Sequence, residues 1–512
     1  MIQFATHVGS RTLRRSARRS ADRARGTGRR LVVRMLQGAV ALVLGGCATP
    51  FLHPAVDVPQ QFAESRPSDI GPDVVWWESF GDPVLAELVR RAAQQNRDIR
   101  MASERVRAAR AGEAISRSWL LPSLDGVGYG GTVRQTLPDV DARVAALAVS
   151  WEVDLSGRLR AGAEASKADK IAAIDAERGI RLLVLSDVAT AYFTMIGAQR
   201  QLEAVRAIAA AQDETLRLVT SRHRVGLASP FDVERARTQA STANAAIPPL
   251  ETLEAVSRHR IAVLIGDQPA NSSALVPWTG VAVVPNVQPG QPAELLERRP
   301  DLLEARARLE AANWRRQQAE AEWFPRLFAM ALFGHQDVQE NNVDLQSSRF
   351  SNAAGLLTIP LFNWGRTRAI NEAAESAQTE AVLQYEDRIV RALEDVENAL
   401  VGLREDRLRQ DALQNAADAA NAAFDRAQSL YDRGQTDLLP LLDAQRTRLS
   451  VRVSAIESNT RMFLSAITLF KALGGGWESF EPNASQNQAS STTAPANAPR
   501  IASHDSKPKE HT

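Results

Sequence analysis

The residue types that most often carry out catalysis occur in this sequence without the spacing that catalysis needs. The seven histidines form no HExxH metal-binding motif, and neither a GxSxG nucleophile motif nor a GxxxxGK[ST] phosphate-binding loop occurs. A glycine cluster over residues 126–131 is similar to a dinucleotide loop, but no helix is expected directly after it, so we interpret these glycines as strand residues. Acidic pairs such as Glu394-Asp395 are typical of a solvated helix face. We therefore expect no enzymatic activity, no metal ion and no cofactor.

The single cysteine, Cys47, has a spacing that favours lipid attachment. An Arg-rich segment over residues 11–34 precedes the apolar run 35–44, which is followed by Gly45, Gly46 and Cys47. A basic region, a short apolar region and small residues are the parts of a secretory signal. The run 44–47 also resembles a bacterial lipobox, in which the thiol forms a thioether to the lipid. A buried cysteine on an apolar helix is the alternative. We predict a signal peptide over 1–46 and lipidation at Cys47.

Charge and cysteine content exclude several classes of protein. One cysteine excludes a disulfide framework and a cysteine-based zinc site. Residues 1–46 hold ten arginines and one aspartate, a net charge of +9, so the total of +1 leaves −8 for the rest. An acidic body argues against nucleic acid as a partner. No window of 18 or more uncharged apolar residues occurs, and we expect no transmembrane helix.

The 512-residue chain contains the same pattern twice. The segment 222–236 reads RHRVGLASPFDVERA, and the segment 431–444 reads YDRGQTDLLPLLDA. Aligning their glycines gives an offset of 208, which also matches two points further upstream; two earlier points match at an offset of 203. The matched points, in chain order, are Asp98 with Asp301, Leu121-Pro122 with Phe324-Pro325, Gly157-Arg158 with Gly365-Arg366, Asp187 with Asp395, and Gly226 with Gly434. We infer an internal duplication.

Each half predicts a helix, a short strand pair, a very long helix, a tight turn and a second long helix. The first helix is expected from about Pro83 to Trp119. No proline occurs between Arg160 and Val225, and a helix of that extent is about 100 Å long at roughly 1.5 Å per residue. Apolar residues follow it at alternating steps of three and four, as in a coiled coil: Leu185, Val188, Tyr192, Met195, Leu202, Val205, Ala209, Leu216 and Val219. Such a helix belongs to a rod, bundle or barrel.

Two strand pairs are predicted, over residues 124–136 and 143–154 in the first half and 326–336 and 350–360 in the second. Polar loops join them, and the second loop, 337–348, is expected to be the longer one. Strands of about ten residues are long enough to cross an outer membrane when tilted. A soluble hairpin beneath the helices is the alternative. Because about eight strands are the fewest that close a membrane barrel, four strands from one chain require several copies.

These features together resemble the outer-membrane-factor family, the TolC-like exit ducts of tripartite efflux pumps, and more narrowly its NodT-type lipoproteins. The features are the lipobox, Trp76-Trp77 before Phe80-Gly81-Asp82, the duplicated halves, and the tips Arg224-Val225-Gly226-Leu227 and Arg433-Gly434. The resemblance covers roughly residues 47–480. It implies a mainly α fold with a small β part, in which a homotrimer forms a 12-stranded transmembrane β-barrel continued by a long periplasmic α-helical barrel.

The resemblance also implies a domain organisation and partners. We expect a signal peptide (1–46), a lipidated extended segment (47–82), a first repeat (83–278), a linker (279–292), a second repeat (293–480) and a disordered tail (481–512). The expected partners are two further copies of the chain, a periplasmic adaptor protein, an inner-membrane pump of the RND type and outer-membrane lipid. The expected function is passive export of drugs or other small molecules.

The helix-hairpin tips hold the candidate functional residues. Gly226 and Gly434 are expected to adopt the positive φ that ends a long helix, and Asp232 and Asp437 to cap the returning helices. The family places a carboxylate ring at the periplasmic entrance, which implies a gate of Asp437, Asp443, Arg433, Leu438 and Leu439. Pro440 replaces an acidic residue found in some relatives. The tips that meet the adaptor are then Val225, Gly226, Leu227, Gly434, Gln435 and Thr436.

Three other functions remain open from the sequence. A duct for exported polypeptide is the runner-up to small-molecule efflux. A lipid-anchored coiled-coil scaffold without a pore shares the helices but leaves the strand pairs unexplained. A lipid-anchored periplasmic enzyme needs a catalytic constellation that the motifs above do not supply.

Overall fold

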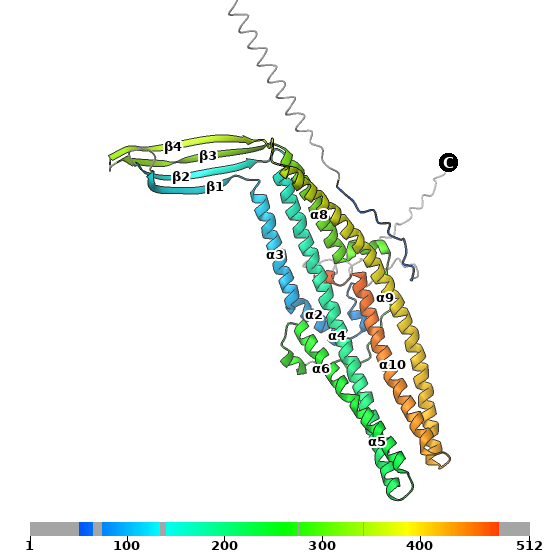
Figure 1. Cartoon of the computed structure of the whole chain (residues 1–512). Coiled ribbons are helices and arrows are strands. Elements are labelled where there is room, and N and C mark those ends of the chain that lie inside the picture. The colour runs from blue at the N-terminus through cyan, green and yellow to red at the C-terminus, as the bar shows by residue number, and fades with distance from the viewer. Residues whose placement is uncertain (1–50, 65–73, 134–139, 275, 341–342, 481–512) are drawn as a thin grey trace, which may run out of the picture. The chain divides into compact units, whose positions relative to one another are not determined.

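A computed structural model describes residues 51–64, 74–133, 140–274, 276–340 and 343–480. Figure 1 shows a sheet and a set of long helices. The predicted signal peptide, Cys47 and the predicted tail lie outside the described residues. The strands are β1 (Ser123–Val133), β2 (Val140–Val153), β3 (Arg326–Glu340) and β4 (Val343–Thr358). The α-helices are α2 (Pro83–Gln95), α3 (Arg97–Ser118), α4 (Arg158–Arg224), α5 (Pro230–Ala245), α6 (Ile247–Leu264), α7 (Leu295–Arg298), α8 (Pro300–Glu320), α9 (Arg366–Asp432) and α10 (Leu438–Leu473).

The chain forms two compact units, and each contains segments from both halves of the sequence. Among the described residues, the first unit comprises those within 51–53, 113–166 and 310–380, and it holds the sheet. The second comprises those within 54–112, 167–309 and 381–480, and it holds most of the helices. The duplicated halves therefore interleave in each unit.

The sheet is antiparallel in the order β1-β2-β3-β4, so β1 and β4 each pair on one side only. The β3–β4 ladder runs from Arg326↔Thr358 to Glu340↔Val343, with one register shift at Val338/Gln339. The expected long loop over 337–348 is therefore wrong, because most of it is strand. Backbone hydrogen bonds hold a ladder whatever the side chains are, so the polarity of this segment did not mark the end of a strand.

The two longest helices, α4 and α9, contain 67 residues each. The predicted apolar stripe of α4 is confirmed: Leu185, Val188 and Tyr192 are fully buried, and Val219 is 1% exposed. Within the described residues, one 18-residue stretch, in α4, is apolar enough to cross a membrane, and 56% of it is buried in the protein. Packing against other helices accounts for this hydrophobicity.

The predicted continuous helix from Pro83 to Trp119 is wrong, because Asn96 divides it into α2 and α3. Asn96 has extended backbone angles, φ −60° and ψ 134°. Its Oδ1 accepts hydrogen bonds from the N–H of Asp98 at 2.8 Å and of Ile99 at 3.2 Å, as an N-cap does. Its Nδ2 donates to the carbonyl of Leu264 at 2.8 Å, so the break joins the start of α3 to the end of α6.

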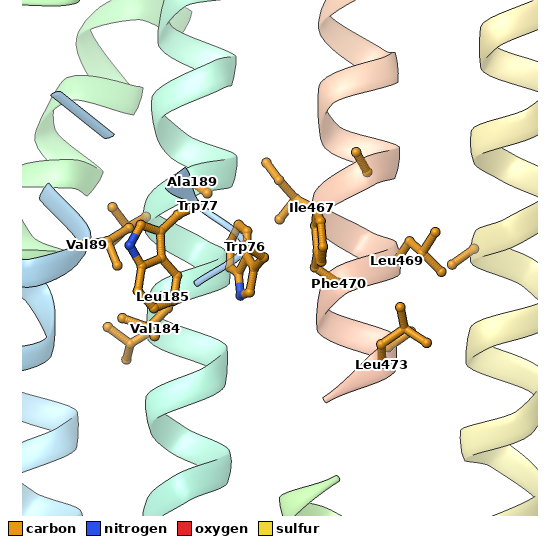
Figure 2. Packing of buried hydrophobic residues seen from close by; sticks show 14 of the residues in the cluster. Trp76, Trp77, Val89, Val184, Leu185, Ala189, Ile467, Leu469, Phe470 and Leu473 are labelled. Atoms are coloured by element: carbon orange, nitrogen blue, oxygen red, sulfur yellow. The ribbon is translucent and has the colours of Figure 1, made fainter. Parts of the chain in front are cut away.

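An aromatic cluster forms the centre of the helical unit (Figure 2). Trp76 lies between α4 and α10 and stacks on Phe470, with ring centroids 5.3 Å apart. Phe193 of α4 stacks on Phe463 of α10 at 4.4 Å. Buried Asp82 caps α2 and accepts a hydrogen bond from Tyr192 Oη at 2.8 Å. Burial raises the pKa of Tyr192 well above its ordinary value, so the phenol stays a donor.

The extended segment before residue 65 runs along α9. The N–H of Ala55 donates to Glu386 Oε1 at 2.9 Å, and that of Ala63 donates to Glu397 Oε1 at 2.6 Å. Glu64 also forms an ion pair with Arg404. We call residues 54–64 the N-terminal strap. Because its contacts are eleven and seven residues apart on α9, it covers one face of that helix.

Candidate functional site

The first helix-hairpin tip, between α4 and α5, is shaped by a glycine. Gly226 has a φ of +76°, which confirms its predicted role. Its N–H donates to the carbonyl of His223 at 3.0 Å, and the N–H of Leu227 donates to the carbonyl of Arg222 at 2.8 Å. This pair of bonds is a Schellman motif, which satisfies the last carbonyls of the helix and turns the chain back.

The second tip, between α9 and α10, repeats this geometry 208 residues later. Gly434 has a φ of +69°. Its N–H donates to the carbonyl of Tyr431 at 2.9 Å, and the N–H of Gln435 donates to the carbonyl of Leu430 at 2.9 Å. A side chain added at either glycine would meet no atom within 4 Å, so both turns are open to a partner.

The returning helices begin differently at the two tips. At α5, Ser229 and Asp232 form a capping box: the Asp232 N–H donates to Ser229 Oγ at 3.2 Å, and the Ser229 N–H donates to Asp232 Oδ2 at 2.9 Å. The Ser229 hydroxyl also donates to Asp232 Oδ2 at 2.7 Å, and this bond, together with the bond from the Ser229 N–H, lowers the pKa of Asp232. The predicted capping role of Asp232 is confirmed.

At α10, Asp437 occupies the N-cap position, but its side chain makes no capping hydrogen bond. An N-cap side chain bonds the backbone N–H of the residue two or three positions on, and one of these two donors is missing here because the third residue on is Pro440. The predicted capping role of Asp437 is therefore wrong: its exposed carboxylate accepts no capping hydrogen bond from the first turn of α10.

Asp443 lies six residues beyond Asp437, about one and a half turns further into α10, and it is paired. It accepts a hydrogen bond from Arg446 at 2.7 Å, and both side chains are more than half exposed. A pocket of about 70 Å³ between the two hairpins is lined by Asp443 and Arg446 together with Asp232 and Arg235 of α5. The structure thus brings Asp443 beside the first hairpin.

The remaining predicted tip residues lie at the surface. Val225 and Leu227 are 68% and 77% exposed, large fractions for apolar side chains. Leu439 is 51% exposed, and Arg433 and Gln435 are exposed as well, while Thr436 is half-buried. Leu438 is the first residue of α10. In the part of the chain that the structure describes, no cluster of His, Cys, Asp or Glu suited to a metal ion is found.

Comparison with known proteins identifies the family. A family model described as outer membrane efflux protein matches residues 88–267 and 292–475. The chain is 30% identical over 455 residues to outer membrane protein OprJ of Pseudomonas aeruginosa, covering 86% of this chain and 95% of the relative. It is 28% identical over 457 residues to the probable outer membrane lipoprotein SilC of Salmonella typhimurium, covering 87% and 99%.

The open-state structure of the MtrE outer membrane channel of Neisseria gonorrhoeae is also similar. It superposes with a TM-score of 0.76 at 26% identity, over 84% of this chain and 98% of that one. The chain belongs to the outer membrane efflux protein family. The predicted family, fold class and outer-membrane location are thereby confirmed. The two matched segments of the family model fall one in each half of the predicted duplication.

In this efflux protein, sequence reasoning missed a contact between the hairpins. The guanidinium of Arg222, at the end of α4, lies 5.3 Å from the ring centroid of Tyr431, at the end of α9. A cation over an aromatic ring is attracted by the ring's quadrupole. The residues belong to different repeats, so no local spacing could have indicated that they meet.

Sequence reasoning also missed Arg299, a buried residue just before α8. Its Nη1 donates to the carbonyl of Ala472 at 3.0 Å, at the end of α10, and its Nη2 donates to Asp301 Oδ2 at 2.8 Å and Asp395 Oδ2 at 3.0 Å. Burial alone would raise the pKa of Asp301, but the hydrogen bonds and charge of Arg299 lower it overall. Arg299 therefore joins α8, α9 and α10 at one point.

The first repeat connects its corresponding helices through a different residue. At the offset of 203, Arg299 corresponds to Asn96, and at the offset of 208, Ala472 corresponds to Leu264, the residues that are bonded there. Gly266 and Gly474, also 208 apart, follow α6 and α10 with positive φ. The duplication could have indicated this shared junction, although not the change from asparagine to arginine.

Proposed function

We propose that this protein is the exit duct of a tripartite efflux pump: a non-catalytic homotrimer that passes drugs or other small molecules from the periplasm to the exterior. The observation that carries the proposal is the open sheet. Its four strands contain 11 to 16 residues, enough to cross a bilayer, and both edge strands lack a second neighbour. Long unpaired edges do not persist in lipid, so the sheet needs other copies to close it.

Three copies give twelve strands, which exceeds the roughly eight that close the smallest membrane barrels. They also give six helices of 67 residues, each about 100 Å long at roughly 1.5 Å per residue. Small residues allow such helices to approach closely, and alanine-rich runs occur in both long helices, over 207–211 and 416–423. These features support a closed strand barrel continued by a helical tube.

The partners follow from the exposed tips. Val225 and Leu227 beside Gly226 form an exposed apolar turn, and Gly434, Gln435 and Thr436 form its counterpart. Both suit contact with the hairpin of a periplasmic adaptor, which links the duct to an RND-type pump in the inner membrane. Attachment of lipid to Cys47 adds an anchor in the outer membrane.

The gate follows from the second tip. The carboxylate of Asp437 makes no capping hydrogen bond, and Asp443 lies about one and a half turns further along the same helix. In a trimer each contributes three negative charges around one axis, a ring that attracts cations and narrows the entrance. In this proposal Arg433 pairs with a carboxylate of the next copy, and Leu438 and Leu439 fill the bore.

Mass and conductance measured on one preparation test the proposal. Purified protein in nanodiscs is expected to give a native mass three times that of the mature chain, and to form ion-conducting channels in planar bilayers. Production in a strain that lacks its own exit duct is expected to restore drug resistance. A monomer without conductance would overturn the proposal; a conducting trimer that never restores resistance would leave the channel but refute drug efflux.

A further inference from the structure

The helical unit contains a groove of about 930 Å³ at the junction that Arg299 makes. Residues from α3, α4, α8, α9 and α10 line it. Binding pockets for small organic molecules commonly measure a few hundred to about 1,000 Å³, so this groove has room for a drug-sized molecule. Its apolar part comes mostly from α4, where Leu183 is 47% exposed and Ile180 is half-buried.

The groove lies on the uncovered face of α9. The N-terminal strap is bonded to Glu386 and Glu397, whereas the groove is lined by Arg388, Asp395 and Gly402. At about 100° per residue, the second set is turned roughly half a circle from the first. The strap therefore occupies one side of the helix, and the groove opens on the other. If the strap lies on the outside of the tube proposed above, the groove opens toward the passage.

The ionic groups of the groove leave positive charge in excess. Five cationic side chains line it against three carboxylates. Arg299 is satisfied by Asp301 and Asp395, and Arg308 pairs with Glu304. Within the described residues, no ion pair or hydrogen bond is formed by the other three cationic side chains, which are Arg105, Arg388 and Lys471. The positive charge of Arg388 nevertheless helps to lower the pKa of Asp301.

The internal duplication shows that this charge is not needed to build the junction. The first repeat forms the corresponding bond with Asn96 at the position of Arg299, and it has Ile180 and Val263 at the positions of Arg388 and Lys471. At these three positions the first repeat thus has two apolar residues and one amide, whereas the second repeat has three cationic residues. Arg388 and Lys471 therefore have no cationic counterpart in the first repeat, and both line the groove.

We propose that this groove is a binding site for amphipathic organic anions, held by Lys471 and Arg388 at the acidic group and by the apolar wall of α4 at the hydrocarbon part. The proposal rests on the duct function, since the groove meets exported molecules only if its open side faces the passage. An anion gains from two unpaired cations in a partly enclosed site, while a cation of the same shape is repelled. The duct wall would thus favour one charge class of cargo.

Equilibrium dialysis of the nanodisc-embedded trimer against naphthalene-2-sulfonate tests this site. The matched probes are the cation naphthalene-2-methylammonium and the neutral 2-naphthol. We expect saturable binding of the sulfonate that weakens as salt is added, and at least about tenfold weaker binding of the cation. Absence of saturable sulfonate binding, or equal affinity for both charged probes, would overturn the proposal.

Three variants and a control locate the site. Lys471→Gln and the double variant Arg388→Gln/Lys471→Gln are expected to weaken sulfonate binding, the double variant by about tenfold or more, and Lys471→Glu to abolish it. Arg409→Gln, an exposed cation on the same face of α9 two turns beyond Gly402, is the control and should change binding less than twofold. Equal loss in Arg409→Gln would show that general charge, not the groove, attracts the probe.

Conductance of the same preparations separates this inference from the proposed function. Channels that conduct normally but bind no sulfonate would refute the groove and leave the duct. Preparations that form no channels at all would refute the duct, whatever they bind. Because the side chain of Lys471 is exposed and forms no hydrogen bond or ion pair within the described residues, its variants should keep the trimer intact.

Discussion

At the scale of single residues, the two aspartates proposed as the gate differ in the hydrogen bonds that their side chains make. Asp437 makes no capping bond, whereas Asp443 is tied to Arg446. Because these side chains narrow the proposed entrance and carry negative charge, we expect Asp437→Ala and Asp443→Ala to raise single-channel conductance and to lower cation selectivity, and the double variant to do both more strongly. Currents in planar bilayers at low salt measure both properties.

A control for this gate is available at the same tip. Asp432 is the last residue of α9 and accepts a hydrogen bond from Gln428 at 2.8 Å, on the other side of the turn. Asp432→Ala should leave conductance near the wild-type value. Unchanged conductance and selectivity in the double variant Asp437→Ala/Asp443→Ala would contradict the gate.

Substitutions at Gly226 can distinguish two roles of this residue: its positive φ in the turn and its proposed contact with the adaptor. Its φ of +76° disfavours alanine by about 1–2 kcal/mol, whereas asparagine tolerates this region. If the turn meets an adaptor, Gly226→Asn and Gly226→Asp should both abolish drug export while trimers persist, because added bulk blocks the contact. Drug-resistance assays and trimer yield measure the two effects. Export retained in Gly226→Asn would contradict the contact and leave only a conformational need.

At the scale of elements, the sequence predicts what repeats and misses what depends on distant partners. The offset of 208 located both tip glycines and both long helices, because local hydrogen bonds and side-chain period determine them. Asn96 was missed as a helix break because its partner, Leu264, is 168 residues away. Arg299 was missed because its ligands come from three helices. Burial of a charged residue is decided by such partners, not by its neighbours in sequence.

The capping box of α5 should have a measurable local effect. Ser229→Ala removes one cap bond worth about 1 kcal/mol, so hydrogen exchange in the first turn of α5 should quicken by about fivefold. The pKa of Asp232 is lowered, so its carboxylate stabilises the first turn of α5 fully above about pH 4. This stabilisation is lost as the pH falls through the lowered pKa. The second tip lacks this box, so exchange in α10 should not change. An equal change in both helices would contradict a local cap.

The Arg299 junction should affect the stability of the whole helical unit. Arg299→Ala removes bonds to two carboxylates and to the end of α10, and we expect it to lower stability by about 3 kcal/mol, seen as a lower apparent melting temperature. The control is Arg391→Ala, which breaks an exposed pair with Asp387 and should cost less than about 0.5 kcal/mol.

The pH dependence of this difference gives a second check. The pKa of Asp301 is lowered by Arg299, so the stability from this pair is complete at neutral pH and is lost as the pH falls through the lowered pKa. Arg299→Ala has no such contribution to lose. The difference in melting temperature between wild type and variant should therefore shrink on acidification; a constant difference would contradict the ionic role.

At the scale of the whole molecule, the open edges of the sheet determine how copies must meet. Closure of a barrel pairs β1 of one copy with β4 of the next, and this contact occurs three times around the trimer. The chain has one natural cysteine, and lipid on Cys47 would block its thiol, so introduced cysteines can report the contact cleanly. Gly128→Cys on β1 can be combined in turn with single cysteines at each β4 position from Ser347 to Gly355.

Because side chains alternate between the two faces of a strand, cross-linking in this scan should rise and fall with a period of two along β4. The best pairs should give a covalent trimer on denaturing, non-reducing gels, since each copy is then bonded to both neighbours. Gly128→Cys alone should give none, because β1 does not meet β1 in a closed ring. Cross-linked dimers from the single variant, or no trimer at any β4 position, would mean that the edges are covered in some other way and that the chain does not close a twelve-stranded barrel.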